Sequence, residues 1–489
     1  MTSRGSLYLL LLALFWASLS MARFSSLEAT LDDSWISFRT ARNWIEHGSL
    51  TFDLTQPPVE GMTNFLWTII SGLFIALFGG DPIVWMRVLG AGSFLALILL
   101  SYSGVKQQNG AGGISAFLLA CHGGLAFYAL SGLETAFFGL LFTLSLFLLP
   151  KIEETSSAIS LGIILGLLGW TRPEGVLIGI LFSGYLLYTS PPQKRPWLTI
   201  FLWMGLIGML EICRLSLYDS LVPNTFRAKP PNPVGGLRYA LNYLIEVMGV
   251  LGILTILPAL RDSANRLIAL VGILLFIGAI WSGGDWMPSY RQLIIPTLSF
   301  AWLAGLSFRT HGTKRWFQLS LLCWMGASLS SSIQKKDGAI YYNYQFEMLG
   351  RLLAAQPQVT EVALFDIGRF GWGFPRSIYD TAGLTDAHIA KQAGHHGQKE
   401  WDEEYFRSRA PEVLIVLGEG ISAQAALQLE ATRPQDLPLL QTVVQNGGYH
   451  YRANMPIDDR VWLHLFLRDD IRLDEKAFGA IPPIQLPAY

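Results

Sequence analysis

The chain has 489 residues, of which 51% are hydrophobic and 15% charged, with a mean hydropathy of +0.38. It is too apolar for a soluble protein, and runs long enough to cross a bilayer, about 20 residues each, recur up to about residue 333. A formal net charge of −1 provides no basic face for nucleic acid, and the three cysteines lie in apolar runs, which predicts neither a disulfide framework nor a zinc site. The composition therefore predicts a polytopic membrane protein.

Twelve apolar segments follow one another along the chain, and we expect about eleven of them to cross the membrane. They are 6–24, 62–80, 83–104, 111–130, 134–150, 157–171, 175–190, 197–217, 237–259, 267–281, 291–308 and 316–333. The first resembles a secretory signal peptide, but Ala17 to Ala22 form a poor cleavage site, which favours an uncleaved span.

The linkers between these segments are of two kinds. Short basic linkers carry Lys106, Lys151, Lys194, Arg195, Arg261, Arg266, Arg309, Lys314 and Arg315, whereas polar linkers contain SGLET, TRPEG, LYDSLVPNTFRAK and GGDWMPSYR. After residue 104 the two kinds alternate, and the positive-inside rule places the basic kind in the cytoplasm. Lys106 and Asp32 then lie on opposite sides only if 62–80 does not cross but either lies in the membrane interface or enters the membrane and returns to the same side. All polar linkers thus converge on one non-cytoplasmic face.

From about Gln334 the composition becomes that of a soluble domain. Strand-like segments at 361–366, 376–380 and 411–418 alternate with helix-like ones at 342–356, 384–392 and 401–409, which predicts a small α/β domain. We therefore expect a transmembrane domain over 1–333, with its first external loop over 25–82, and a non-cytoplasmic α/β domain over 334–489. Asp366 and Asp380 follow strands; capping of a tight turn is favoured over a ligand site, and no nucleotide-binding motif is present.

Two adjacent carboxylates, Asp32 and Asp33, precede an amphipathic segment after the first span. An N-cap needs only one of them, so the other is a candidate proton acceptor or metal ligand. Arg39 and Arg42 lie a turn apart and are either phosphate ligands or solvated surface residues. Glu60 has a capping and a binding interpretation as well.

Further ionisable residues occur in the later polar linkers, and each is a functional hypothesis because a charge near a membrane is costly unless paired or hydrated. They are Glu134 in SGLET, Arg172 and Glu174 in TRPEG, Asn224 and Lys229 in LVPNTFRAK, and Asp285 and Arg291 in GGDWMPSYR. Glu134 equally suits a helix start, and Arg172 either pairs with Glu174 or faces an anionic headgroup. Trp286 and Tyr290 suit a sugar or the interfacial aromatic belt.

In order along the chain, DDSWISFRTARN, PVEGMTNFLW, SGLET, TRPEG, LVPNTFRAK, GGDWMPSYR and DIGRFGW with DTAGLTD resemble the GT-C superfamily of membrane glycosyltransferases. They are most similar to the branch of the mycobacterial terminal arabinofuranosyltransferases and its uncharacterised bacterial relatives. The resemblance covers about residues 30 to 390.

The resemblance implies transfer of a sugar from a polyprenyl-phosphate donor to a glycan, lipid or protein acceptor, on the outer side of a bacterial inner membrane. In GT-C enzymes the essential carboxylate lies in the first external loop, so the resemblance implies that Asp33 or Asp32 is the base. If the reaction retains configuration, one of them would instead be a nucleophile. The pool of phosphate partners comprises Arg39, Arg42, Arg172, Lys229 and Arg291. A divalent metal is compatible with the motifs but is not predicted, and the motifs do not identify the sugar or the acceptor.

Two other classes of protein share some of these features. A transporter or flippase of lipid-linked sugars predicts charges inside the spans and repeated halves, whereas most charges here lie in loops. A non-enzymatic scaffold whose tail binds envelope glycans would not need paired aspartates and several ordered polar linkers. The glycosyltransferase interpretation is therefore favoured.

Overall fold

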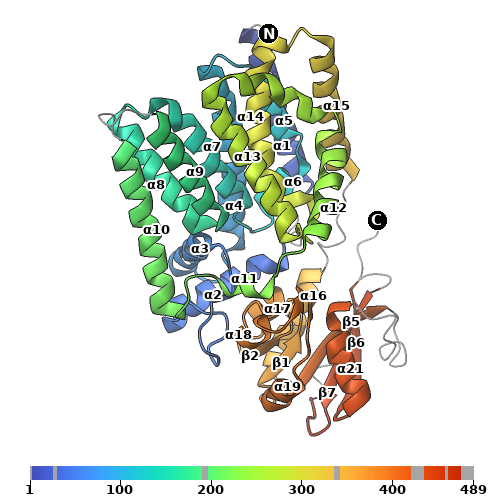
Figure 1. Cartoon of the computed structure of the whole chain (residues 1–489). Helices are drawn as coiled ribbons and strands as arrows, with labels where there is room; N and C mark the ends of the chain where they lie inside the picture. Colours follow the sequence, from blue (N-terminus) through green and yellow to red (C-terminus); the bar gives the residue numbers. More distant parts are fainter. Residues whose placement is uncertain are drawn as a thin grey trace.

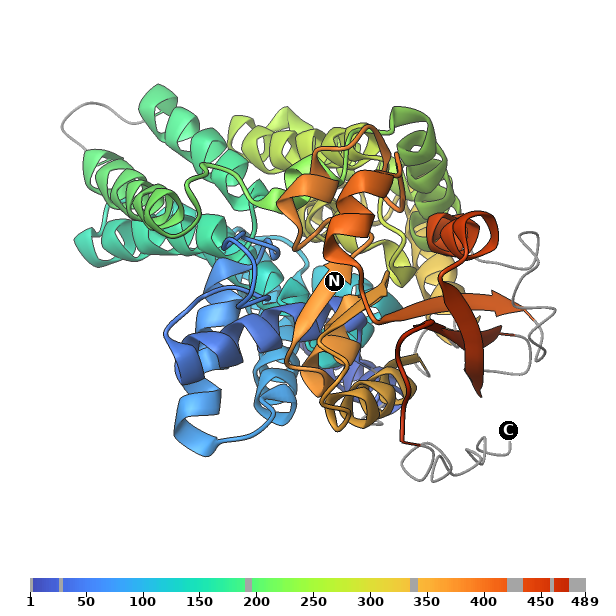
Figure 2. The same cartoon turned by 90° about the horizontal axis from the view of Figure 1, so that it is seen from below.

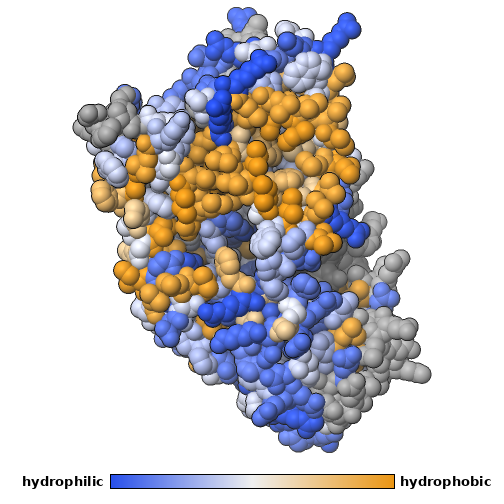
Figure 3. Space-filling model, in the orientation of Figure 1, coloured by the Kyte–Doolittle hydropathy of each residue, from blue (hydrophilic) through white to orange (hydrophobic). Residues whose placement is uncertain are grey.

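The computed structural model describes residues 3–25, 30–189, 196–334, 342–419, 434–457 and 461–474. It consists of a helical bundle and a smaller domain built on a sheet, which lies against one end of the bundle (Figure 1). On the face shown in Figure 3, the bundle carries a broad hydrophobic belt, and the coloured surface of the sheet domain below it is mostly hydrophilic.

Within the described residues, five helices are long and apolar enough to cross a membrane. They are α1 (Ser3–Ala22), α4 (Ile83–Gln107), α10 (Pro196–Tyr218), α13 (Ser263–Ser282) and α14 (Ile294–His311), the last counted with the preceding turn from Pro288. The shorter apolar helices are α3 (Phe65–Phe78), α7 (Thr135–Leu148), α8 (Thr155–Thr171) and α9 (Glu174–Thr189), and α15 spans Arg315–Gln334.

Two predicted spans are bent rather than continuous. The segment 111–130 forms α5 (Gly112–Ala120) and α6 (Gly123–Leu130), which meet at 63°. The segment 237–259 forms α12 (Pro233–Tyr243), extended to Met248, and a 3-10 helix over Gly252–Arg261, which meet at 90°. Gly249 allows the second bend because its φ is +63° and a Cβ there would lie 2.6 Å from Cys323 Sγ.

Contacts near the ends of α1 and α4 show at which end of the bundle each helix begins and ends. At one end, the Ser6 hydroxyl at the start of α1 accepts a hydrogen bond from Gly113 N at the start of α5, the helix that follows α4. At the other end, Arg87 near the start of α4 donates to Ser25 O, just beyond α1. The segment between α1 and α4 therefore returns to the end of the bundle that it left, as the charge pattern predicts. The 14-residue α3 lies in this segment, packed against α2 (Asp32–His47).

The C-terminal domain contains a five-stranded sheet in the order β2-β1-β5-β7-β6. The strands are β1 (Glu361–Leu364), β2 (Ser377–Asp380), β5 (Val413–Glu419), β6 (Tyr449–Pro456) and β7 (Val461–Arg468). β1 is parallel to β2 and β5, whereas β7 is antiparallel to β5 and β6. The first three of these strands are predicted from the sequence, and the last two are not.

Helices cover both faces of this sheet because its strands are apolar on both sides. Val362 and Leu364 face a core shared with α16 (Tyr342–Ala354) and α17 (Ile367–Gly373). Ala363 faces the opposite core, which includes residues of α19 (Glu403–Arg409) and α21 (Leu437–Asn446). Seen from below in Figure 2, the domain lies beside α2 and α3 and covers part of the end of the bundle. Alternating strands and helices were predicted here, and the structure contains them.

Candidate active site

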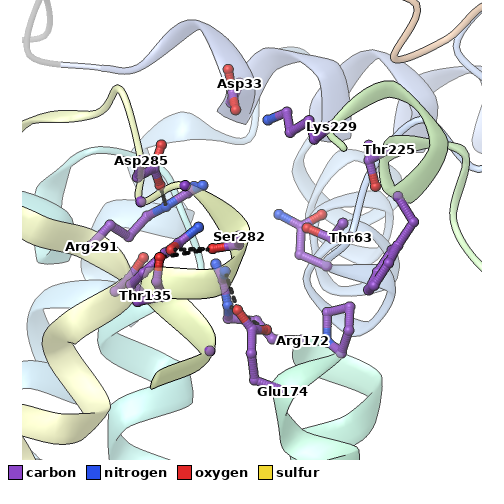
Figure 4. A pocket seen from close by; sticks show the side chains of 18 of the residues that line it. Asp33, Thr63, Thr135, Arg172, Glu174, Thr225, Lys229, Ser282, Asp285 and Arg291 are labelled. Atoms are coloured by element: carbon purple, nitrogen blue, oxygen red, sulfur yellow. Dashed lines mark hydrogen bonds and ion pairs between the residues drawn. The ribbon is translucent and has the colours of Figure 1, made fainter. Parts of the chain in front are cut away.

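A pocket of about 560 Å³ lies where the bundle meets the C-terminal domain. Its walls come from α2, residues 61–64, the starts of α7 and α9, the segment after α11 (Asn224–Ala228), the α13–α14 connection and the C-terminal domain. Each polar linker singled out in the sequence contributes to it. These linkers therefore meet at one pocket, and Figure 4 shows their side chains around one space.

Asp33 lies in the first turn of α2 and lines the pocket. The sequence allowed Asp33 to be the N-cap of this helix, but that interpretation is wrong: α2 begins at Asp32, Leu31 holds the cap position, and no side chain caps it. Burial raises the pKa of the Asp33 carboxyl, and the cations of Lys229 and Arg291 only partly oppose this effect.

A chain of hydrogen bonds forms one wall of the pocket. The Ser37 hydroxyl donates to Asn64 Oδ1 at 2.8 Å, and Asn64 Nδ2 donates to Glu134 Oε2 at 2.8 Å. Arg172 continues the chain, with Nη1 2.5 Å from Glu134 Oε1 and Nη2 2.9 Å from Glu174 Oε1. The network joins α2 and the starts of α3, α7 and α9, and it fixes the Arg172 guanidinium at the edge of the cavity.

The α13–α14 connection supplies a second ion pair, between Arg291 Nε and Asp285 Oδ2 at 2.7 Å. Although burial acts to raise it, the pKa of Asp285 is held below its ordinary value by Arg291 and Lys229. Lys229 is different from the two pocket arginines: within the described residues its ammonium group has no hydrogen bond or ion pair. Figure 4 shows its side chain reaching into the space beside Asp33.

Asp32 does not line the pocket, although it directly precedes Asp33. Its carboxylate accepts hydrogen bonds from the backbone N–H of Gly368 at 2.8 Å and of Arg369 at 2.7 Å. It thereby occupies the N-terminus of α17 in the C-terminal domain. Burial and the nearby Asp366 raise its pKa to about 7, while the two N–H donors act in the opposite direction.

Arg39 and Arg42, considered as phosphate partners from the sequence, are also engaged by the C-terminal domain. Arg39 donates to Phe374 O at 3.1 Å and to Arg376 O at 2.7 Å. Arg42 donates to Trp372 O at 3.1 Å and stacks 4.2 Å from the centre of that indole ring. Neither side chain lines the pocket.

Glu60 and Asn224 lie outside the pocket as well and support its walls. Glu60 forms a buried ion pair with Arg214 of α10, at 2.9 Å from its Nε. Asn224 Nδ2 donates to the carbonyl groups of Gly383 at 2.9 Å and Leu384 at 3.0 Å. The Asp380 carboxylate closes the turn that carries these two residues, which is the capping role favoured from the sequence.

Several pocket residues were not proposed from the sequence. Asn64 lies within the PVEGMTNFLW motif, so its position beside Glu60 was a usable signal. His395 and His396 come from the C-terminal domain, and no motif drew attention to them. In the described part of the chain, no three His, Cys, Asp or Glu side chains gather as the ligands of a metal ion would.

Residues 338–464 match the model of a family described as a domain of unknown function, DUF8728. No curated protein matches the chain. Among solved structures, the chain is similar to ArnT from Cupriavidus metallidurans bound to undecaprenyl phosphate, with 12% identity and a TM-score of 0.58, over 95% of this chain and 98% of that one. It is also similar to the oligosaccharyltransferase AglB from Archaeoglobus fulgidus in complex with an inhibitory peptide and a dolichol-phosphate, with 11% identity and a TM-score of 0.54, over 91% and 72%.

Both proteins belong to the GT-C superfamily, so the GT-C-like fold predicted from the motifs is confirmed. The chain is an α-helical polytopic membrane protein with a C-terminal domain that contains a sheet.

Proposed function

We propose that the protein is a membrane glycosyltransferase that moves a sugar from a polyprenyl-phosphate donor to a cell-envelope acceptor on the non-cytoplasmic face. The observation that carries this proposal is the composition of the pocket, in which Asp33 and a set of cations border directly on an apolar wall. A site for a soluble sugar would not need such a wall beside the hydrophobic belt, and a site for a plain lipid would not need the charges.

The cations are suited to the donor phosphate. The Lys229 ammonium group has no hydrogen bond or ion pair among the described residues, and Arg291 uses only Nε for Asp285, which leaves its terminal nitrogens for a phosphate oxygen. Arg172 is shared by two carboxylates and therefore contributes less free positive charge. As the glycosidic bond breaks, negative charge grows on the phosphate, and fixed cations stabilise this charge more than that of the ground state.

The apolar wall is suited to the lipid. It is formed by side chains of α9, α13 and α14, namely Leu177, Leu274, Leu275, Ile294 and Ile295. Each buried CH₂ group of a lipid contributes about 0.8 kcal/mol. A wall of this kind holds the first isoprene units and leaves the rest of the chain to the bilayer.

Asp33 is suited to act as general base. Its carboxylate accepts the proton of the acceptor hydroxyl, the oxygen bonds to the anomeric carbon, and the bond from that carbon to the phosphate oxygen breaks to release polyprenyl phosphate. Because burial raises its pKa, Asp33 is a stronger base than a solvated aspartate. The arabinofuranosyltransferase branch remains a prediction from the motifs.

The test compares Asp33→Asn with wild type. The purified proteins receive the lipid fraction and the envelope polysaccharide of a strain that lacks the gene, and mass spectrometry follows loss of the lipid-linked sugar and release of polyprenyl phosphate. Asp33→Asn is expected to lower the rate by about 10²–10⁴ without a change in thermal stability. The matched control is Asp219→Asn, an exposed residue with φ of +49°, a conformation that asparagine adopts readily. Full activity of Asp33→Asn would refute the assignment.

A further inference from the structure

A hairpin of the C-terminal domain completes the wall of the pocket that lies away from the membrane helices. It comprises β3 (Gly394–His395) and β4 (Gln398–Lys399), and both His395 and His396 line the pocket. Among the described residues of this domain, Leu384 also lines the pocket. The bundle alone therefore forms an incomplete site.

The conformation of the hairpin projects His396 from its tip. Gly394 pairs with Lys399 and His395 with Gln398, which leaves His396 and Gly397 as a two-residue turn. Gly397 has φ of +75°, and a Cβ at this position would lie 2.7 Å from the side chain of Gln435. Glycine is thus required next to His396 for the turn and for its close packing.

Lys399 fixes the base of the hairpin. Its ammonium group donates to the carbonyl oxygens of Ala390 and Gln392, both at 3.1 Å, and to Arg227 O at 3.2 Å. Arg227 belongs to α11 of the membrane domain, two residues before Lys229. The hairpin and the pocket lysine are therefore held in a defined relation to each other.

The imidazole of His396 is a neutral hydrogen-bonding group. Its ring packs 5.7 Å from that of Phe365, and within the described residues its Nδ1 atom is buried without a hydrogen-bond partner. Burial and the nearby Lys229 lower its pKa to about 3. A neutral imidazole both donates and accepts a hydrogen bond, as a hydroxyl group does, but it provides no charge for a phosphate.

The two walls of the pocket thus differ in chemistry. The wall formed by the bundle carries Arg172, Arg291, Lys229 and the apolar residues, which suit an anionic lipid. The wall formed by the C-terminal domain carries the histidine pair and Leu384, which suit a neutral molecule with hydroxyl and apolar faces. Among the described lining residues, every lysine and arginine comes from the bundle and none from the C-terminal domain.

Building on the proposed function, we propose that the hairpin over residues 394–399 is the acceptor subsite, and that His396 hydrogen-bonds a hydroxyl group of a neutral glycan acceptor. This contact orients the acceptor so that a neighbouring hydroxyl faces Asp33. The acceptor is accordingly a polyhydroxylated sugar chain without charge at its reacting end.

The experiment measures transfer by His396→Ala and His396→Gln in the full-length protein, with the two substrate fractions described above varied separately. Loss of one hydrogen bond is expected to raise KM for the polysaccharide about tenfold, with KM for the lipid-linked donor unchanged. The glutamine variant restores part of the loss because its amide also donates and accepts. The control is His450→Ala, an exposed histidine of β6 that contacts Asp469.

Three results would overturn the inference. The first is an unchanged KM for the polysaccharide in His396→Ala, the second is a rise in KM for the donor instead, and the third is a fall in kcat alone. A thermal midpoint equal to wild type in His396→Gln shows that a rise in KM does not come from misfolding. These results are separate from those of the proposed function, because an inactive Asp33→Asn variant together with unaffected His396 variants would reject the hairpin alone.

Discussion

Replacing Arg39 by lysine separates the two roles that the sequence and the structure give to this residue. As observed, its guanidinium donates to two carbonyl groups of the C-terminal domain and lies 4.2 Å from the ring centre of Phe52. Burial lowers its pKa to about 9, so the group stays charged at neutral pH. A lysine ammonium lacks the planar fork that donates from Nη1 to one carbonyl group and from Nη2 to the other, so we expect one of these two hydrogen bonds to be lost. The lost charged hydrogen bond and weaker stacking together cost about 2–4 kcal/mol.

The cost should appear where the two domains meet, so the assay is amide hydrogen exchange of α17, residues 367–373. A loss of about 2–4 kcal/mol accelerates exchange about 30- to 1000-fold, provided that local opening governs it. The affinity for undecaprenyl phosphate, titrated in parallel, should stay unchanged. Arg351→Lys is the control, because Arg351 forms an exposed ion pair with Glu347. Weaker lipid binding by Arg39→Lys, with unchanged exchange in α17, would refute the structural role and restore the phosphate role.

The remaining predictions concern the pocket. Lys229→Gln should raise the Kd for undecaprenyl phosphate about tenfold, measured by native mass spectrometry; an unchanged Kd would argue against a contact with phosphate. Because the pKa of Asp33 is raised above 3.8, kcat/KM should fall with decreasing pH through a value higher than 3.8. If kcat/KM stays constant as the pH falls to 3.8, the raised pKa of Asp33 is contradicted. Glu134→Gln should destabilise the protein by about 3 kcal/mol, because the buried Glu134–Arg172 pair loses one partner. In a double-mutant cycle with Arg172→Gln, measured by thermal unfolding, the two losses of stability should not add. Full additivity would contradict the coupling between the two side chains.

The location of the pocket was predictable because it depends on properties that can be read from short stretches of the sequence. Hydrophobic length and the side on which basic residues lie are local, and together they place Glu134, Arg172 and Asp285 at one end of the bundle. The same reasoning predicts that 62–80 does not cross, and the contacts Ser6–Gly113 and Arg87–Ser25 agree with it. No long-range contact had to be known for these inferences.

The partners of individual charges were not predictable in this way. Arg39 bonds to Phe374 O, 335 residues further along the chain, and Asp32 bonds to Gly368 N, 336 residues further on. Both are charged residues on an amphipathic helix, and the sequence shows that each needs a partner but not which partner. From the sequence alone, a phosphate group and a set of backbone carbonyl groups are equally suitable hydrogen-bond partners for an arginine. His396 was missed for a related reason, since its role depends on packing between two domains.

The adjacent aspartates connect the contact between the two domains to the proposed catalytic step. Successive side chains of a helix point about 100° apart, and here Asp33 faces the pocket whereas Asp32 points to the start of α17. Asp32 bonds to α17 of the C-terminal domain, which also carries the hairpin of His396. A displacement of that domain would therefore act directly on the helix turn that carries Asp33. The Asp32 carboxylate thus links the helix turn of the proposed base to the domain that carries the proposed acceptor wall, which gives the second aspartate a role other than capping α2.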